Sequence, residues 1–387
     1  MTLNKWVESL QVSEIRQFEE QTKNIPDILK LTLGEPDFNT PERIKQAAIQ
    51  AIHDNYSHYS AMGGDKELRQ AASRYFEKKY DLHYSVSEII VTVGATEAIA
   101  VSLKTIINSN ERILIPTPAF PAYAGVSQLL GAPFVLVDTS AVAFKLTPEL
   151  LQHEIDKEPT IKAVVLNFPN NPTGVTYTKD ELKALVPVLR KNDLYVISDE
   201  IYSELDFSGY HVSMAAFYRE KTILINGLSK SHAMTGWRIG FLMAPAPLAA
   251  ELIKVHQFYV TGATTIAQRA AITALNACEN AALPMREAYI KRKDYLMKEL
   301  SLLGFEIISP QGGFYLFAEI PRALRCGTAF AFCLDLAKEA KVSLIPGSAF
   351  GTVYQGYVRF SFAASFETLH EAIKRIRHYT EQKRVQA

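Results

Sequence analysis

Two cations, Lys230 and Arg238, lie close together in the stretch NGLSKSHAMTGWRIG (226–240). Their neighbours are small or apolar residues, and the stretch contains no acidic residue. A charge packed among apolar groups needs a counter-ion, because removing it from water is costly. The stretch therefore predicts a bound ligand that brings the groups these two cations bind.

Polar residues also follow the other apolar runs of the chain. An open α/β sheet binds its ligands beyond the carboxyl ends of its strands, so these residues are candidates for one shared site. The run that ends at Gly94 leads into a helix, whose first free N–H groups favour a phosphate. The residues at these run ends are Gly94, Ala95, Thr96, Asn170, Asn171, Asp199, Glu200, Tyr202 and Lys230.

Together these groups suit a phosphorylated heteroaromatic aldehyde. Lys230 can condense with the aldehyde, Asp199 can keep a ring nitrogen protonated, and Arg238 can pair with the phosphate. Each residue also has an ordinary structural role available: a solvated lysine, a helix-capping aspartate, or an arginine stacked on Trp237. Their coincidence at successive strand ends favours the functional interpretation.

The elements that must position these groups are strands alternating with helices. Runs such as EIIVTVG, KAVVLNFP, LYVISDE and TILINGLS are apolar on both faces, and helix-like segments separate several of them. This pattern predicts an α/β fold with a mostly parallel sheet covered by helices. Later runs such as GGFYLFAEI and GYVRFSFA indicate a smaller α+β domain. We expect a large domain over 41–285, a small domain over 286–387, and packing of residues 1–40 on the small domain.

Composition and motifs narrow the class of protein. Lys+Arg and Asp+Glu each total 41, so no net charge attracts nucleic acid or an anionic membrane. No apolar run reaches the roughly 18–20 residues that span a bilayer, and the first residues lack the apolar core of a signal peptide. The cysteines form no close pair, which favours a cytoplasmic location. No GxGxxG, P-loop, GxSxG or HExxH pattern occurs, and we expect no metal site.

Blocks across nearly the whole chain resemble those of one enzyme family. The stretch at 226–240 resembles the cofactor-lysine signature of fold-type I pyridoxal-phosphate enzymes, specifically the class I/II aminotransferases. The other similar blocks, in family order, are LTLGEPDFNTP, HYSAMGG, VTVGATEA, NFPNNPTG, SDEIYSEL, PQGGFYLF and VRFSFA. The set is most like the aromatic amino-acid aminotransferases, with N-acetyl-diaminopimelate aminotransferases as near relatives.

The resemblance implies pyridoxal 5'-phosphate as the cofactor and assigns its ring contacts. Lys230 would bind the cofactor covalently and later move the proton at the substrate α-carbon, provided that burial lowers its pKa. Asp199 would face the pyridine nitrogen and keep it cationic. Tyr202 and Asn171 would hydrogen-bond the ring hydroxyl, and Phe120 would stack on the ring.

The resemblance also assigns the phosphate and substrate contacts. Ala95 and Thr96 would donate backbone N–H groups to the phosphate, with Arg238 as its counter-ion. Tyr59 matches a tyrosine that reaches the phosphate from the partner subunit, so the expected active unit is a homodimer. Arg359 would grip the substrate α-carboxylate by a two-pronged pair, with Gly34 and Asn171 beside it.

One position departs from the commoner family pattern. Many relatives have a phosphate-binding serine three residues before the lysine, where this chain has Gly227. Ser229 and Ser231 flank Lys230, and either can supply the missing hydroxyl. The sequence leaves this choice open.

The resemblance predicts transfer of the amino group of an aromatic L-amino acid to a 2-oxo acid such as 2-oxoglutarate. N-acetyl-diaminopimelate, aspartate or broad specificity is the alternative within the family. A C–S lyase on the same fold is a second enzyme class, and it shares the lysine and the aspartate. A pyridoxal-phosphate-binding transcription regulator is a third class, but it needs a DNA-binding domain ahead of LGEPDF, where only about 30 residues precede it.

Overall fold

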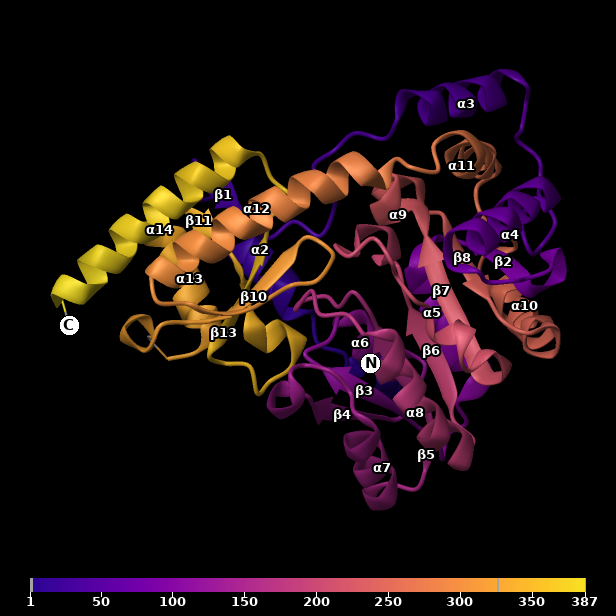
Figure 1. Ribbon diagram of the computed structural model, residues 1–387, viewed down its shortest axis with the longest axis horizontal. Helices are drawn as coiled ribbons and strands as arrows, with labels where there is room; N and C mark the ends of the chain where they lie inside the picture. The colour runs from indigo at the N-terminus through magenta and orange to yellow at the C-terminus, as the bar shows by residue number, and fades with distance from the viewer. Residues whose placement is uncertain (1–2, 326, 387) are drawn as a thin grey trace.

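The computed structural model describes residues 3–325 and 327–386, which form two lobes joined by a long helix (Figure 1). Within these residues the larger lobe is built on a seven-stranded sheet in the order β2-β8-β7-β6-β5-β3-β4. The strands that the apolar runs predicted are parallel where they pair with one another. Their bounds are β2 (Ile89–Thr92), β3 (Arg112–Thr117), β4 (Phe134–Asp138), β5 (Ile161–Asn167), β6 (Tyr195–Asp199) and β7 (Thr222–Gly227).

Strand β8 (Gly240–Met243) was not anticipated from the sequence. It lies between β2 and β7 and is antiparallel to both, and Gly227 pairs with Gly240. A strand of four residues that directly follows a turn gives no periodicity to detect. Its pairing places Arg238 next to the residues that follow β7.

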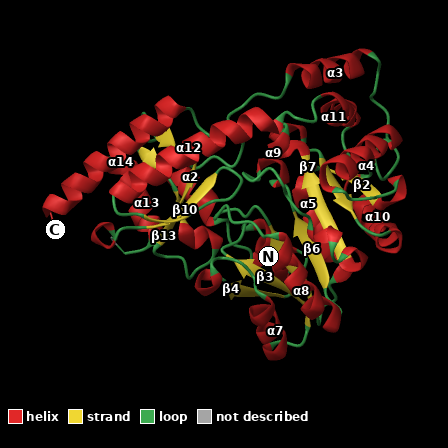
Figure 2. Cartoon of the chain, in the orientation of Figure 1, coloured by secondary structure: helices red, strands yellow, loops and turns green. Residues whose placement is uncertain are grey.

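Helices cover both faces of this sheet, as is usual for parallel strands buried on both sides (Figure 2). Capping residues in the sequence explain where several of these helices begin. Thr178 and Glu181 form a capping box at α8, Thr147 caps α7 ahead of Pro148, and Asp65 caps α4. The helices of this lobe are α3 (Glu42–His53), α4 (Lys66–Tyr80), α5 (Gly94–Ile106), α6 (Ala122–Leu129), α7 (Pro148–Lys157), α8 (Lys179–Lys191), α9 (Leu228–Ser231), α10 (Ala246–Val260) and α11 (Thr265–Ala277).

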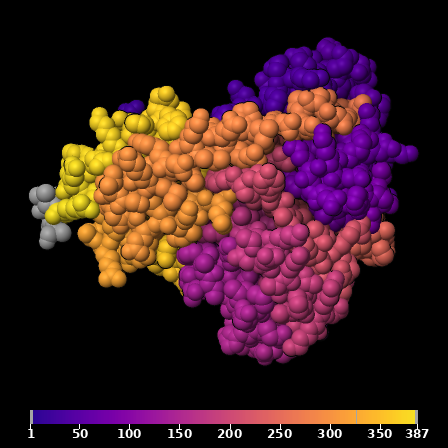
Figure 3. All heavy atoms as spheres, in the orientation of Figure 1, coloured from indigo at the N-terminus to yellow at the C-terminus, as the bar shows by residue number. Residues whose placement is uncertain are grey.

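The smaller lobe contains a four-stranded antiparallel sheet in the order β12-β13-β10-β9, with all of its strands among the described residues. The orange band of α12 continues from this lobe onto the larger one in the space-filling view (Figure 3). The elements of this lobe are α12 (Ala282–Leu302), β9 (Glu306–Ile308), β10 (Tyr315–Glu319), α13 (Ala329–Glu339), β11 (Val342–Ser343), β12 (Ile345–Pro346), β13 (Tyr357–Ser361) and α14 (Phe366–Gln386).

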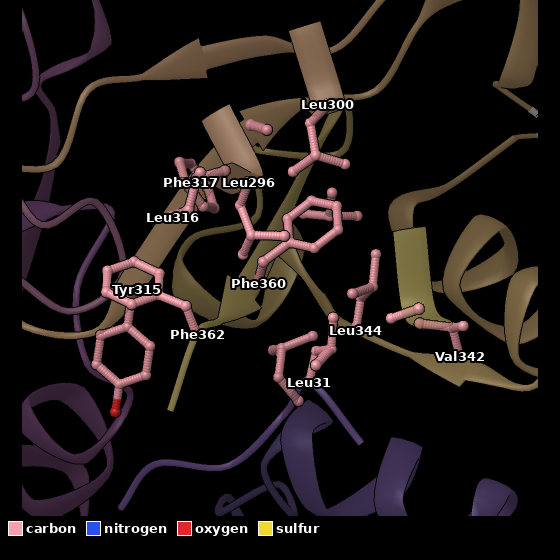
Figure 4. Packing of buried hydrophobic residues seen from close by; sticks show 14 of the residues in the cluster. Leu31, Leu296, Leu300, Tyr315, Leu316, Phe317, Val342, Leu344, Phe360 and Phe362 are labelled. Carbon is pink, nitrogen blue, oxygen red and sulfur yellow. The ribbon is translucent and has the colours of Figure 1, made fainter. Parts of the chain in front are cut away.

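The N-terminal segment contacts both lobes. Helix α1 (Lys5–Glu8) packs on α6, whereas α2 (Glu14–Thr22) packs on α13 and β12, and β1 (Leu29–Lys30) pairs in parallel with β11. Leu31 lies in the core of the smaller lobe beside Leu344 (Figure 4). Tyr315 belongs to the same core, and its hydroxyl points away from the other labelled residues (Figure 4). None of the helices in the described part of the chain is long and apolar enough to cross a membrane.

Candidate active site

A cleft of about 780 Å³ lies beyond the carboxyl ends of the central strands, and residues of both lobes line it. Eleven of the twelve residues that were assigned a cofactor or substrate contact line this cleft, and the twelfth, Tyr59, does not. Two further candidates, Asn170 and Glu200, do not line it either: Asn170 bonds Thr173, and Glu200 bonds Ser198 and Ser213. Tyr59 lies on the surface with 92% of its area exposed. The residues brought together are Gly34, Ala95, Thr96, Phe120, Asn171, Asp199, Tyr202, Ser229, Lys230, Arg238 and Arg359.

Lys230 lies on the short helix α9, directly after β7. Its ammonium group donates a hydrogen bond to the carbonyl oxygen of Gly34 and lies 5.9 Å from the ring centroid of Tyr202. Burial lowers its pKa to about 8, and the negative field of Glu35 only partly offsets this effect. A pKa lowered toward neutrality makes the neutral amine far more available than in an ordinary lysine, as a nucleophilic or proton-moving lysine requires.

Asp199 ends strand β6 and is 3% exposed. Its carboxylate accepts hydrogen bonds from the Tyr123 hydroxyl at 2.7 Å and from the Ile201 N–H at 3.2 Å. Burial nevertheless raises its pKa to about 6, because those hydrogen bonds do not replace the lost water. A cation placed against this carboxylate, such as a protonated ring nitrogen of the cofactor, would favour its ionised form.

Arg359 is buried and points into the cleft from β13. Its guanidinium donates to the side-chain oxygen of Asn171 at 2.9 Å and to the carbonyl oxygen of Thr32 at 2.8 Å. It also lies 4.3 Å from the centre of the Tyr315 ring. No acidic residue of the described chain forms an ion pair with it, and its Nε atom has no hydrogen-bond partner. A buried cation of this kind matches a ligand carboxylate.

Tyr315 is a site residue that sequence reasoning missed. Its hydroxyl lies 3.1 Å from the hydroxyl of Tyr202, and it lines the cleft beside Arg359. Tyr123, which holds Asp199, was also missed. Tyr315 lies in the family-resembling block PQGGFYLF, and Tyr123 lies three residues after Phe120, but only packing shows that they reach the site.

The phosphate end of the candidate site is the N-terminus of α5. Arg238 donates to the carbonyl oxygens of Thr235 at 3.0 Å and Val93 at 3.5 Å, and no described acidic residue pairs with it. Gly94 has φ +74°, and a Cβ atom there would lie 2.4 Å from Arg238 Nη2. Glycine is therefore required for the arginine to lie across the helix start, where free N–H groups favour an anion.

The two serines beside Lys230 have different surroundings. Ser229 lines the cleft, whereas the Ser231 hydroxyl lies 2.8 Å from His232 Nδ1 and 3.3 Å from the Gly227 carbonyl oxygen. A Cβ atom at Gly227 would lie 2.8 Å from the carbonyl oxygen of Ile239. The close approach of β7 and β8 explains the glycine, and Ser229 is the hydroxyl available to a ligand.

We expect Ser229→Ala to raise the dissociation constant for pyridoxal phosphate about tenfold, because one hydrogen bond to a charged group is lost. Ser231→Ala removes the same atom from a position outside the cleft and serves as the matched control. Spectroscopic titration of the cofactor-free protein measures both constants. Equal effects in the two variants would show that Ser229 has no special contact with the phosphate.

Comparison with known proteins identifies the class. Residues 26–376 match the family model described as "Aminotransferase class I and II", so the chain belongs to that family. It is 43% identical to a probable N-acetyl-LL-diaminopimelate aminotransferase of Bacillus subtilis, over 99% of this chain and 96% of that protein. It is 37% identical to an aspartate aminotransferase of Geobacillus stearothermophilus, over 98% and 99% of the two chains.

A solved aromatic aminotransferase of Pyrococcus horikoshii superposes with a TM-score of 0.88 at 35% identity, and the match covers 95% of this chain and 99% of that one. The protein is therefore an enzyme, a pyridoxal 5'-phosphate-dependent aminotransferase with the α/β fold predicted from its strand pattern. The names of these relatives span three amino donors, so family membership leaves the donor open.

The residues present fit this cofactor. The anion cradle at Gly94 and Arg238 suits its phosphate, the buried carboxylate of Asp199 suits its ring nitrogen, and Lys230 suits its aldehyde. When bound, pyridoxal phosphate supplies an electron sink conjugated to the reacting carbon. The protein side of the chemistry is then binding, orientation and proton movement.

Proposed function

We propose that this enzyme transfers the α-amino group of an aromatic L-amino acid to a 2-oxo acid such as 2-oxoglutarate. The observation that carries the proposal is the set of apolar side chains that line the cleft besides the residues assigned to the cofactor. These side chains suit a large apolar substrate group: Leu10, Ile15, Leu33, Ile99, Val126 and Leu129.

The distribution of charge in the cleft supports the same choice. Lys230, Arg238 and Arg359 have the roles described above, which leaves Arg16 as the other cation that lines the cleft among the described residues. Arg16 is paired with Glu19 at 2.8 Å on helix α2. No unpaired cation is therefore left for the second carboxylate of aspartate.

In this proposal each site residue has a separate role in binding or proton transfer. Arg359 holds the α-carboxylate, with Asn171 and the backbone at Gly34 beside it. Lys230 moves the proton at the substrate α-carbon, and its lowered pKa suits both uptake and release of that proton. Asp199 and Tyr202 bind the cofactor ring, and Phe120 stacks on it.

The second candidate donor is N-acetyl-diaminopimelate, which the 43% identity to the Bacillus subtilis protein favours. Its far carboxylate would have to draw Arg16 away from Glu19. An exposed arginine pair of this kind separates at small cost, since such pairs contribute about 1 kcal/mol or less.

A panel of amino donors at fixed 2-oxoglutarate tests the proposal. We expect kcat/KM for phenylalanine and tyrosine to exceed the value for aspartate and for N-acetyl-diaminopimelate by about tenfold or more, as apolar burial of a ring predicts. A preference for N-acetyl-diaminopimelate would overturn the aromatic assignment. Formation of pyruvate from cystathionine without any 2-oxo acid acceptor would instead indicate a C–S lyase.

We also propose a homodimer in which Tyr59 completes the phosphate site of the second copy. Its 92% exposure supports this role, because a tyrosine that serves its own subunit would be packed against it.

The proposed division into units 41–285 and 286–387 places the boundary in the first turns of α12, with residues 1–40 on the smaller unit. A cytoplasmic location is part of the same proposal.

A further inference from the structure

The segment from Ser57 to Gly64, here called the arm, carries Tyr59 and contains no helix or strand. Its tip is exposed, since Tyr59 is 92% and Met62 is 46% exposed. A segment without regular structure that presents a side chain to another molecule needs anchors elsewhere, because ordering it costs conformational entropy. Among the described residues, four side chains from outside the arm hydrogen-bond to it: His256, Gln268, Thr265 and Arg69. Two of them, His256 and Gln268, are fully buried and belong to helices distant in sequence, and these two are here called the anchors.

The first anchor is His256 of α10, which is fully buried. Its Nε2 atom lies 2.8 Å from the carbonyl oxygen of Met62, and its Nδ1 atom lies 2.6 Å from Glu97 Oε1. A carbonyl oxygen only accepts, so Nε2 carries the hydrogen that holds the arm. Glu97 lies in the first turn of α5, where its other oxygen accepts the Val93 N–H at 2.5 Å. His256 therefore connects the arm to the helix that binds phosphate in its own subunit.

The second anchor is Gln268 of α11, which is also fully buried. Its side-chain oxygen accepts the Asp65 N–H at 2.6 Å, directly after the arm. Its amide nitrogen donates to the carbonyl oxygen of Ala263 at 2.7 Å and lies 3.1 Å from the Ser60 hydroxyl. Gln268 thus contacts the arm beside Tyr59, at Ser60, and directly after the arm, at Asp65. It forms no hydrogen bond with Glu97.

The backbone adds to these anchors. The Val91 N–H donates to the carbonyl oxygen of Gly63 at 3.0 Å. Gly64 has φ +96°, and a Cβ atom there would lie 2.4 Å from Val91 Cγ2. The base of the arm is therefore fixed on strand β2, while Tyr59 at its tip is exposed to solvent in the single chain.

We propose that His256 and Gln268 are positioning residues that hold the arm so that Tyr59 reaches the cofactor phosphate in the second copy of the chain. The proposal rests on the role of Tyr59 under the proposed function. Buried polar side chains contribute modest net stability and specify geometry, because each misplaced partner leaves an unsatisfied group. Their effect on the phosphate site is therefore exerted through the hydroxyl of Tyr59.

A double-mutant cycle on cofactor affinity tests this inference. The variants are Tyr59→Phe, His256→Gln, Gln268→Met and the two combinations with Tyr59→Phe. His378→Gln, on the exposed face of α14, is the matched histidine control. The dissociation constant for pyridoxal phosphate is measured by titrating each cofactor-free protein, with light scattering to confirm an unchanged oligomeric state and far-UV circular dichroism to confirm folding.

We expect Tyr59→Phe alone to weaken cofactor binding about tenfold, as loss of one hydrogen bond to a phosphate predicts. Each anchor variant alone should weaken binding by a similar factor, and each double variant should bind no more weakly than Tyr59→Phe. If the factors multiply in the double variants, the anchors do not act through Tyr59 and the inference is wrong. If Tyr59→Phe binds the cofactor normally, the assigned role of Tyr59 is what fails.

Testing two anchors separates a specific effect on the arm from a general loss of folding. Gln268→Met leaves Glu97 and α5 unchanged, so any loss of cofactor binding in this variant reports the effect of the arm and not an effect on the phosphate-binding helix. Normal binding in both anchor variants, together with weakened binding in Tyr59→Phe, would show that the arm needs neither anchor and would overturn the inference.

Discussion

Replacement of Lys230 by alanine is expected to lower kcat by about 10⁴-fold or more, because the nucleophile and the group that moves the α-proton are the same amine. Lys230 is placed for both tasks by α9, which holds it between the carbonyl of Gly34 and the ring of Tyr202. The cofactor-loaded variant should also lack the visible absorption of a covalently bound cofactor. Retention of both turnover and this absorption would show that another residue has the role.

The control for this variant is Lys374→Ala on α14, a lysine whose side chain is 82% exposed. It removes the same functional group from the surface and should leave kcat unchanged.

The rate at which wild-type apoprotein binds the cofactor covalently should rise as pH increases through about 8, the lowered pKa of Lys230. The sign follows from the amine, which reacts only after it has lost its proton.

Replacement of Arg359 by alanine is expected to raise KM for the amino acid roughly 10²–10³-fold, because it removes the partner of a desolvated carboxylate. The 2-oxo acid has the same α-carboxylate, so its KM should rise as well. Steady-state kinetics with each substrate varied in turn measures both values. An unchanged KM for either substrate would contradict the assignment of Arg359.

Arg359→Lys provides a graded comparison at the same position. Lysine keeps the positive charge but cannot form the two-pronged pair of a guanidinium, so the rise in KM should be intermediate. The control is Arg190→Ala on α8, which removes a half-exposed arginine that forms an ion pair with Glu220. This variant should leave KM unchanged. Thermal unfolding of each variant shows whether the fold is retained.

One structural feature bears on how such an enzyme selects its donor. The lining of the cleft comes partly from the N-terminal segment, which packs on both lobes. Exchange of a few residues in that segment would therefore change the side-chain pocket without altering Lys230, Asp199 or Arg359. This arrangement is consistent with a family whose relatives use aspartate, aromatic and N-acetyl-diaminopimelate donors.

The sequence by itself determined the class of chemistry. Residue type and position at the end of an apolar run are local properties, so Lys230, Asp199 and Asn171 could be placed at one sheet edge before any contact was known. Strands β5, β6 and β7, which these residues follow or end, are neighbours in the parallel part of the sheet, and their polar ends meet in the cleft.

Only the tertiary structure decided how these groups are supported. Tyr315 of β10 reaches Tyr202 of the larger lobe and lies beside Arg359 on the neighbouring strand β13, and the unanticipated strand β8 brings Arg238 over Gly94. The close pairing of β7 with β8 also distinguishes Ser229 from Ser231. Such contacts join residues that are distant in sequence, and their distances are set by packing of whole elements. Local sequence pattern does not contain that information, which is why the reacting groups were predictable and their supporting partners were not.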